Sequence, residues 1–214
     1  MNIAILGSGQ VGRALGAGLA RHGHDVIMGT RDPAAAPVAQ WVAEVGERAT
    51  AGSYADAASR CDLACLVTAW SGTENALRLV GADNLAGKVV IDVTNPLGYG
   101  PGGPYMVIGY TDSGGEQVQR WLPQAKVVKA WNIVANANMV DPNIPGGPAD
   151  MFICGNDPAA KQTVTELLAE SGWPSTIDVG GIEGARLLEP LAMLWIGYAI
   201  SHASGSHAFK LLRP

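Results

Sequence analysis

The fold of this chain is decided by its opening stretch, Asn2-Ile3-Ala4-Ile5-Leu6-Gly7-Ser8-Gly9-Gln10-Val11-Gly12. The apolar run predicts a strand over residues 2–6, and the glycines that follow it have the spacing G-x-G-x-x-G. Small and apolar side chains then recur at the spacing of one helix face, at Val11, Ala14, Leu15, Gly18 and Leu19. A strand, a glycine-rich turn and a helix in this order are typical of a dinucleotide-binding unit.

Each glycine of the turn has a separate task in such a unit. Gly7 permits the tight turn, Gly9 lets backbone amides approach a pyrophosphate, and Gly12 lets the helix pack closely on the strand. Ser8, Gln10 and Val11 occupy the other positions, where free amides at the start of the helix face the anion. The alternative is that the glycines only make a short turn between strand and helix.

Strand-like and helix-like patterns alternate along the rest of the chain, which is typical of a parallel sheet covered by helices. We therefore predict an α/β protein of the doubly wound Rossmann class, with a mostly parallel sheet and a small helical C-terminal part. Residues 1–140 are expected to form the nucleotide-binding domain, and residues 141–214 a smaller part that completes the substrate pocket. The predicted strands lie near residues 2–6, 25–29, 62–68, 88–93, 126–131, 151–154 and 175–179.

Charge, cysteine spacing and apolar stretches limit the partners, the metal sites and the location that we expect for this chain. A formal net charge of −5 argues against nucleic acid as the main partner. The three cysteines have no metal-ligand spacing, so neither a disulfide framework nor a metal site is expected. The start of the chain lacks the features of a signal peptide. The apolar stretch over residues 191–203 is shorter than the roughly 20 residues that cross a bilayer, so we expect a cytoplasmic protein without a membrane span.

The end of the second strand bears on the choice between NAD and NADP. The stretch Val26-Ile27-Met28-Gly29-Thr30-Arg31 carries no carboxylate that could accept a hydrogen bond from a ribose 2′-hydroxyl. A 2′-phosphate would instead meet the hydroxyl of Thr30 and the guanidinium of Arg31. NADP is therefore favoured over NAD. The alternative is that Arg31 is a solvated charge that pairs with Asp32.

Residues after the other strands are expected at the ligand crevice, because ligands of open α/β sheets bind at the carboxyl ends of the strands. Ala69 and Trp70 follow the third predicted strand, and Asn95 and Asn132 follow the next two. The two asparagines are candidate anchors for a carboxamide or a carbonyl group, or they cap a helix or turn. The segment 96–115 is rich in Gly and Pro, and we expect it to be a long loop over the site.

Acid and base groups are sparse. No Lys-x-x-x-Asn pair occurs on a helix of the second half and no Tyr-x-x-x-Lys pair occurs anywhere, so no catalytic side chain is assigned. His202 and His207 are either proton donors or, as we prefer, histidines whose ring nitrogens bond to the backbone. Hydride transfer between two redox rings needs little side-chain chemistry, which makes this scarcity informative.

A helix is predicted over residues 184–203, and Pro190 should start or kink it. Leu191, Leu194, Trp195 and Tyr198 form one apolar face, and other apolar residues cover the remaining faces. Such a helix must be buried on nearly all sides. In a short chain this favours contact with a second subunit, hence a homodimer, or a pocket for an aromatic ligand.

These segments together resemble the coenzyme F420-dependent NADP oxidoreductase family over nearly the whole chain. The resemblance is carried by the Gly7–Gly12 turn, by Gly29-Thr30-Arg31, Thr68-Ala69-Trp70 and Lys129-Ala130-Trp131-Asn132, and by the stretches 186–191 and 207–212. It implies hydride transfer between NADPH and the deazaflavin of F420. It also implies that Ser8, Gly9, Gln10 and Val11 hold the pyrophosphate, that Thr30 and Arg31 hold the 2′-phosphate, and that Ala69, Trp70, Asn95 and Ala135 border the nicotinamide and the second ring.

Two other functions stay open on the sequence alone. One is an NADPH-dependent reductase of a flavin or of a small imine or carbonyl substrate, and the other is a non-catalytic NADP-sensing module. A ring-sized aromatic pocket would favour an enzyme, and Trp70, Trp131, Trp195 and Tyr198 can supply it or belong to the core. The phosphate and acidic tail of F420 would need cations at the pocket mouth. Arg186, Lys210 and Arg213 are candidates, or they are ordinary solvated charges.

Overall fold

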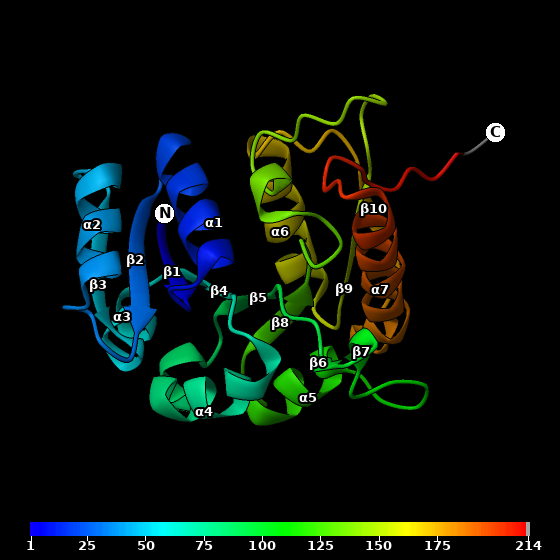
Figure 1. Ribbon diagram of the computed structural model, residues 1–214. Coiled ribbons are helices and arrows are strands. Elements are labelled where there is room, and N and C mark those ends of the chain that lie inside the picture. Colours follow the sequence, from blue (N-terminus) through cyan, green and yellow to red (C-terminus); the bar gives the residue numbers. More distant parts are fainter. Residues whose placement is uncertain (213–214) are drawn as a thin grey trace.

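The computed structural model describes residues 1–212 and confirms the predicted doubly wound α/β class (Figure 1). One eight-stranded sheet has the order β10-β9-β8-β5-β4-β1-β2-β3. All neighbouring strands pair in parallel except β8 and β9, which are antiparallel. The strands are β1 (Asn2–Leu6), β2 (Asp25–Thr30), β3 (Ala49–Ser53), β4 (Leu63–Leu66), β5 (Val89–Asp92), β8 (Lys126–Lys129), β9 (Met151–Gly155) and β10 (Thr176–Asp178).

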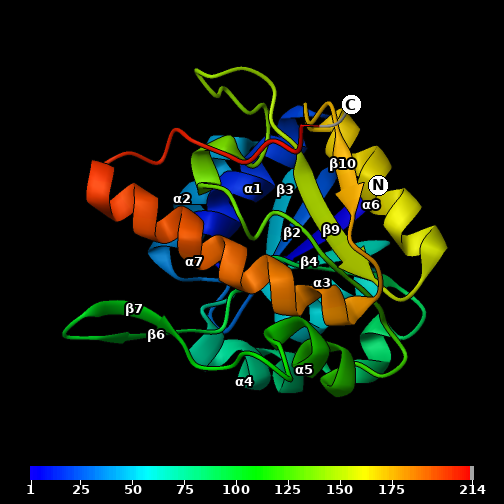
Figure 2. The same ribbon diagram turned by 90° about the vertical axis from the view of Figure 1, so that its right-hand side faces the viewer.

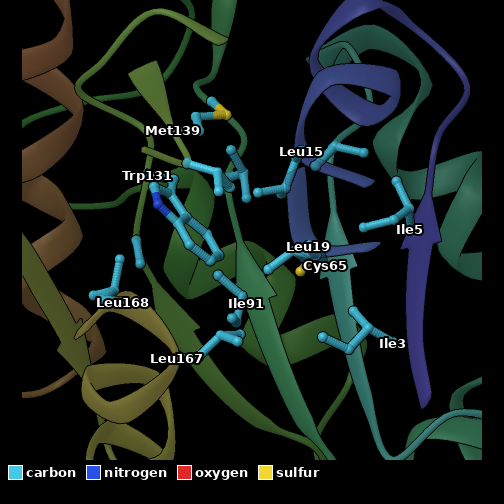
Figure 3. Close-up of a cluster of buried hydrophobic side chains, with 14 of the residues drawn as sticks. Ile3, Ile5, Leu15, Leu19, Cys65, Ile91, Trp131, Met139, Leu167 and Leu168 are labelled. Atoms are coloured by element: carbon cyan, nitrogen blue, oxygen red, sulfur yellow. The ribbon is translucent and has the colours of Figure 1, made fainter. Parts of the chain in front are cut away.

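Helices cover both faces of the sheet, and each face has its own buried apolar cluster. One cluster joins α1 (Gln10–Arg21), α2 (Ala36–Val45) and α6 (Pro158–Glu170), and Figure 3 shows Trp131 among its side chains. The other cluster joins α3 (Tyr54–Arg60), α4 (Trp70–Val80), α5 (Gly114–Trp121) and the first turns of α7 (Ala185–His202). Three short 3-10 helices, η1 (Ala82–Leu85), η2 (Asn136–Asn138) and η3 (Ile182–Gly184), complete the described part.

The structure corrects the expectation of a long loop over residues 96–115. A hairpin of β6 (Leu97–Gly100) and β7 (Gly103–Met106) occupies the first part of the segment, and α5 begins at Gly114. Gly103 has a φ of +95°, which lets the tight turn form. Strand β3 was also not predicted. It lies at the edge of the sheet, and its small side chains give no strong apolar pattern.

The C-terminal helix lies where it was predicted. It begins at Ala185 and continues through Pro190, so of the two effects predicted for the proline, starting the helix is excluded. A proline near a helix start removes only one internal hydrogen bond, and this helix accommodates that loss. The helix is also not buried on nearly all sides within one chain, because Leu187, Leu194, Tyr198 and Ile200 are exposed. Figure 2 shows α7 lying across one side of the molecule, with the β6–β7 hairpin projecting beside it.

No helix within residues 1–212 combines the length and the apolar character that crossing a membrane requires.

Candidate functional site

The turn after β1 has the geometry of an anion cradle. Gly7 has a φ of +133°, and a Cβ on Gly12 would overlap the carbonyl oxygen of Gly7. Helix α1 begins directly behind the turn with Gly9 as its N-cap, and no side chain caps it. A Cβ on Gly9 would meet no atom within 4 Å, so the space in front of these amides is open. The first turn of α1 can therefore donate hydrogen bonds to a phosphate placed there.

A cavity of about 410 Å³ lies in front of this turn. It extends from the glycine-rich turn to the end of β2 on one side and to the first turns of α4 on the other. Helix α4 begins after Ala69, again without a side-chain cap, so a second helix N-terminus lies at the cavity. The lining residues are Gly7, Ser8, Gly9, Thr30, Arg31, Tyr54, Val67, Thr68, Ala69, Ser71, Gly72, Asn75 and Ala76.

The end of β2 brings a hydroxyl and a guanidinium to this cavity. Thr30 is buried, and its Oγ1 lies 3.2 Å from Oγ of Ser8 in the glycine-rich turn. Arg31 is exposed and belongs to none of the ion pairs found within residues 1–212. The carboxylate of Asp32 accepts a hydrogen bond from the amide of Ala34 instead of pairing with Arg31. Thr30 and Arg31 are thus placed together where a phosphate could bind both.

The two residues at the start of α4 lie differently. Ala69 lines the cavity, whereas the ring of Trp70 stacks on Trp121 of α5, with 5.7 Å between the ring centroids. The residue predicted to border a bound ring therefore presents its indole to a neighbouring helix. Its backbone still forms the first turn of α4.

Asn95 and Asn132 bind each other. Nδ2 of Asn95 donates to the carbonyl of Asn132 over 2.8 Å, and Nδ2 of Asn132 donates to Oδ1 of Asn95 over 3.0 Å. Nδ2 of Asn132 also donates to the carbonyl of Leu188 in α7, over 3.0 Å. Ala135 lies nearby in sequence and beside Gly205 of the segment that follows α7. The asparagines thus join two strand ends to the C-terminal helix.

The aromatic residues proposed for a common pocket do not form one group, because Trp70 stacks on Trp121, Trp131 lies in the core, and Trp195 and Tyr198 both contact His207. Trp131 is fully buried in the core, in a left-handed backbone conformation with a φ of +59°. Trp195 and His207 stack with 4.5 Å between their ring centroids. Nε1 of Trp195 donates to the carbonyl oxygen of His207 over 2.8 Å, and Nε2 of His207 lies 3.0 Å from the carbonyl oxygen of Trp195, which can only accept. Tyr198 stacks on His202. Both histidines bond to backbone carbonyls, as preferred from the sequence.

Two of the three cations expected at the pocket mouth, Arg186 and Lys210, are engaged in ion pairs. Arg186 binds both carboxylate oxygens of Glu116, which lowers the pKa of that carboxyl group. Lys210 binds Asp150 over 2.8 Å. Arg213 lies outside the described residues.

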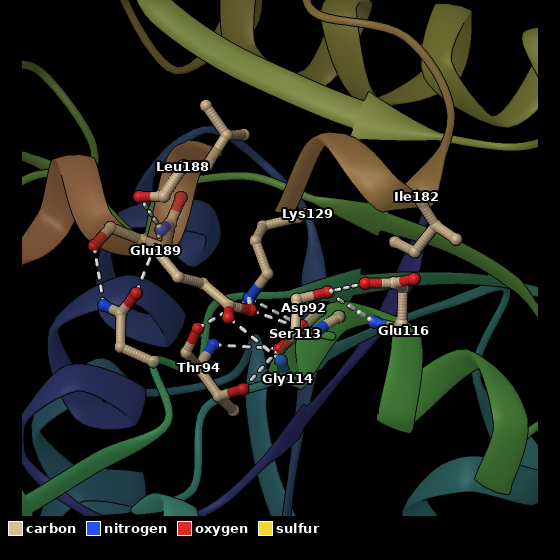
Figure 4. A network of polar contacts seen from close by, with 12 residues as sticks. Asp92, Thr94, Ser113, Gly114, Glu116, Lys129, Ile182, Leu188 and Glu189 are labelled. Atoms are coloured by element: carbon tan, nitrogen blue, oxygen red, sulfur yellow. Dashed lines mark hydrogen bonds and ion pairs between the residues drawn. The ribbon is translucent and has the colours of Figure 1, made fainter. Parts of the chain in front are cut away.

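A cluster of buried charges lies at the ends of β5 and β8 and was not predicted from the sequence (Figure 4). Lys129 ends β8 with a fully buried side chain, and its Nζ lies 2.8 Å from Asp92 and 3.0 Å from Glu189. Burial by itself would lower the pKa of Lys129, but the two carboxylates outweigh it and raise the pKa above the ordinary lysine value. The only signals in the sequence were a lysine and an aspartate at the ends of apolar strands.

The thiols take no visible part in the site. Cys61, Cys65 and Cys154 are buried and free, and burial raises the pKa of the Cys154 thiol to about 12. Within residues 1–212, no group of three His, Cys, Asp or Glu side chains could hold a metal ion.

Comparison with known proteins shows the family. The model of the family described as "NADP oxidoreductase coenzyme F420-dependent" matches residues 2–96. The F420-dependent NADP reductase of Methanocaldococcus jannaschii is 30% identical over 99% of this chain and 98% of its own. A crystal structure of a putative F420-dependent NADP reductase from Arthrobacter sp. FB24 is 40% identical, covers 99% of both chains and has a TM-score of 0.93.

A more distant relative is longer. The metalloreductase STEAP3 of Rattus norvegicus is 29% identical over 90% of this chain, which spans only 37% of that protein. The reductases that match from end to end share the C-terminal part of the chain as well as its nucleotide-binding turn. This chain is an NADP-dependent oxidoreductase and belongs to the family of coenzyme F420-dependent NADP oxidoreductases.

Proposed function

We propose that the protein transfers hydride between NADPH and coenzyme F420. The observation that carries the proposal is the identity of 30% to an F420-dependent NADP reductase over 99% of the chain. A shared nucleotide-binding turn alone would support only NADP binding, because many unrelated reductases have one. The similarity here covers the C-terminal part of the chain as well as the nucleotide-binding turn.

The residues at the glycine-rich turn fit NADPH. In this proposal the amides of Ser8, Gly9, Gln10 and Val11 bind the pyrophosphate, and Gly7 and Gly12 give the turn its shape. Thr30 and Arg31 bind the 2′-phosphate, which the open position of the guanidinium beside the cavity supports. NADPH, when bound, supplies the hydride, and the protein supplies orientation and excludes water.

The acceptor ring would lie beyond the nicotinamide, bordered by Ala69, Asn95, Ala135 and the backbone of Trp70. Residues 141–214 would complete its pocket, because α7 and the segment after it lie beside Asn132 and Ala135. Asn95 and Asn132 would act there as a fixed pair, since most of their hydrogen-bonding groups already bind each other or the backbone.

The direct test is an anaerobic absorbance assay of the purified protein with NADPH and each of four acceptors: F420, FMN, FAD and a panel of small imines. We expect oxidation of NADPH with F420 and slower or no oxidation with the others. Turnover with an imine alone would overturn the F420 assignment. Tight NADPH binding without turnover of any acceptor would favour a sensing role.

We also propose that the protein is a homodimer that pairs through α7. Leu187 and Leu194 are each more than 60% exposed and lie seven residues apart on one face of α7, and Tyr99 of the neighbouring hairpin is 76% exposed. Apolar side chains gathered on one side of a small protein mark an interface. Sedimentation at micromolar concentration should give a dimer, and Leu194→Glu should give a monomer; a wild-type monomer would contradict the proposal.

A further inference from the structure

Lys129 is surrounded by acceptors from three parts of the chain. Its Nζ lies 2.8 Å from Asp92 at the end of β5 and 3.0 Å from Glu189 in α7, and it donates to the carbonyl of Thr94 over 2.7 Å. The three charged side chains are all at least 99% buried. The ammonium thus has three short polar contacts, one hydrogen bond and two ion pairs.

The second carboxylate of the cluster has its own partners. Glu189 accepts hydrogen bonds from the amides of Gly114 and Gly115, both over 2.9 Å. These are the first two residues of α5, where the helix dipole is positive. Asp92 accepts from the amide and hydroxyl of Thr94. Two buried carboxylates are therefore balanced by one ammonium and one helix N-terminus.

A buried cluster of this kind is weak evidence for stability, because desolvation of the charges offsets much of their attraction. Its contacts do fix how the elements that carry the charges are arranged, because each buried charge needs its partners within hydrogen-bonding distance. The arrangement involves the ends of β5 and β8, the start of α5 and the second turn of α7 (Figure 4).

The residues of the cluster are also direct neighbours in sequence of those that hold the Asn95–Asn132 pair. Thr94, whose carbonyl binds Lys129, precedes Asn95, and Glu189 follows Leu188, whose carbonyl binds Asn132. A displacement of α7 would therefore break the contact to Lys129 and the contact to Asn132 together. The cluster and the asparagine pair form two adjacent layers of one joint between the sheet and the C-terminal helix.

We propose that Lys129 and Glu189 are positioning residues, which hold α7 and thereby the acceptor half of the site in register with the nicotinamide end of the sheet. The inference rests on the proposed function, because α7 is the wall of the acceptor pocket in that proposal. Reacting atoms must approach to about 3–3.5 Å, and a misplacement of about 1 Å can cost about 100-fold in rate. The proposed NADPH cradle lies at the ends of β1 and β2 and at the start of α4. Within residues 1–212, none of the residues that line it makes a hydrogen bond or ion pair with Lys129, Asp92 or Glu189.

The test compares Glu189→Gln, which keeps the shape but removes the charge, with Glu189→Asp, which keeps the charge but shortens the reach. Leu85→Ala is the matched control, because it removes a fully buried core side chain of η1 outside the cluster. We expect both Glu189 variants to lose about 10- to 100-fold in kcat with F420. Their Kd for NADPH, measured by fluorescence titration, should change less than about 3-fold, and the primary isotope effect with NADPH deuterated at C4 should rise. Leu85→Ala should keep the kcat of the wild type.

A parallel loss of kcat in Leu85→Ala, or an equal loss of NADPH affinity in the Glu189 variants, would overturn the positioning role. If the wild type does not turn over F420, the proposed function fails, and hydrogen exchange decides the inference. If backbone amides of residues 185–192 exchange faster in the Glu189 variants than in the wild type while those of α1 do not, the result supports the joint. Unchanged amide exchange in both segments overturns it. If Glu189→Gln does not fold, Glu189→Asp carries the same measurements.

Discussion

Arg31 is the side chain that we propose selects NADPH over NADH. Its guanidinium is exposed beside the cavity and, in the described residues, is held by no carboxylate, so a 2′-phosphate would not have to displace a partner. We expect Arg31→Gln to weaken NADPH binding by about 10- to 150-fold, equivalent to about 1.5–3 kcal/mol for a lost hydrogen bond to a charged group. NADH binding should change little.

Titration by fluorescence with both nucleotides measures the difference. Arg78→Gln is a suitable control, because it removes the same charge from the exposed side of α4 and breaks only an exposed i,i+4 pair with Glu74. An equal loss for NADPH and NADH in Arg31→Gln would show that Arg31 supports the fold of the strand end and does not select the phosphate.

Helix α5 depends on a local cap as well as on the distant carboxylate of Glu189. Oγ of Ser113 accepts a hydrogen bond from the amide of Glu116 and lies 2.7 Å from its carboxylate, and Ser113 is fully buried. Ser113→Ala would leave this amide without a partner, and we expect a loss of about 1 kcal/mol in the free energy of unfolding. Urea unfolding measures it. Thr163→Ala in α6, where the hydroxyl only bonds back to the carbonyl of Ala159, should stay within about 0.5 kcal/mol of the wild type.

Some elements of the fold were predicted from the sequence and others were missed, and each outcome has an identifiable physical reason. Strands β1 and β5 and helix α1 were predicted, because their apolar spacing is strong within one short stretch. The β6–β7 hairpin was missed because its glycines and prolines indicate a loop as well as they indicate a tight turn. Helix α5 is short and polar, and its start is stabilised by a carboxylate 75 residues away, so local spacing could not reveal it.

The whole molecule should lose stability in acid. The guanidinium of Arg186 lowers the pKa of Glu116, and Arg120 does the same for Asp112. Burial alone would raise the pKa of Asp150, but Lys210 and the amide of Leu211 outweigh it and lower the pKa. Because the folded-state pKa of each group lies below its ordinary value, the unfolded chain binds protons first as the pH falls.

The contribution of these groups is therefore fully present above about pH 5 and is lost progressively below it. Urea unfolding between pH 3 and pH 7 should show a free energy of unfolding that is nearly flat at the upper end and declines at the lower end. Glu116→Gln should reduce that decline, since the variant has one fewer carboxyl group to protonate. A decline of the same steepness in wild type and variant would mean that the Glu116–Arg186 pair does not contribute.

The sequence by itself determined the class of fold, the glycine-rich turn before α1 and the residues at the end of β2, because each depends on neighbours within a few positions. Gly7, Gly9 and Gly12 act through their own backbone geometry, and Thr30 and Arg31 follow directly from the place where a parallel strand ends. Only the tertiary structure decided that Asn95 binds Asn132, that Trp70 stacks on Trp121, and that Lys129 binds Asp92 and Glu189. These contacts join residues 37, 51, 37 and 60 positions apart, and a buried charge or amide takes whichever partner the packing of distant elements brings within reach.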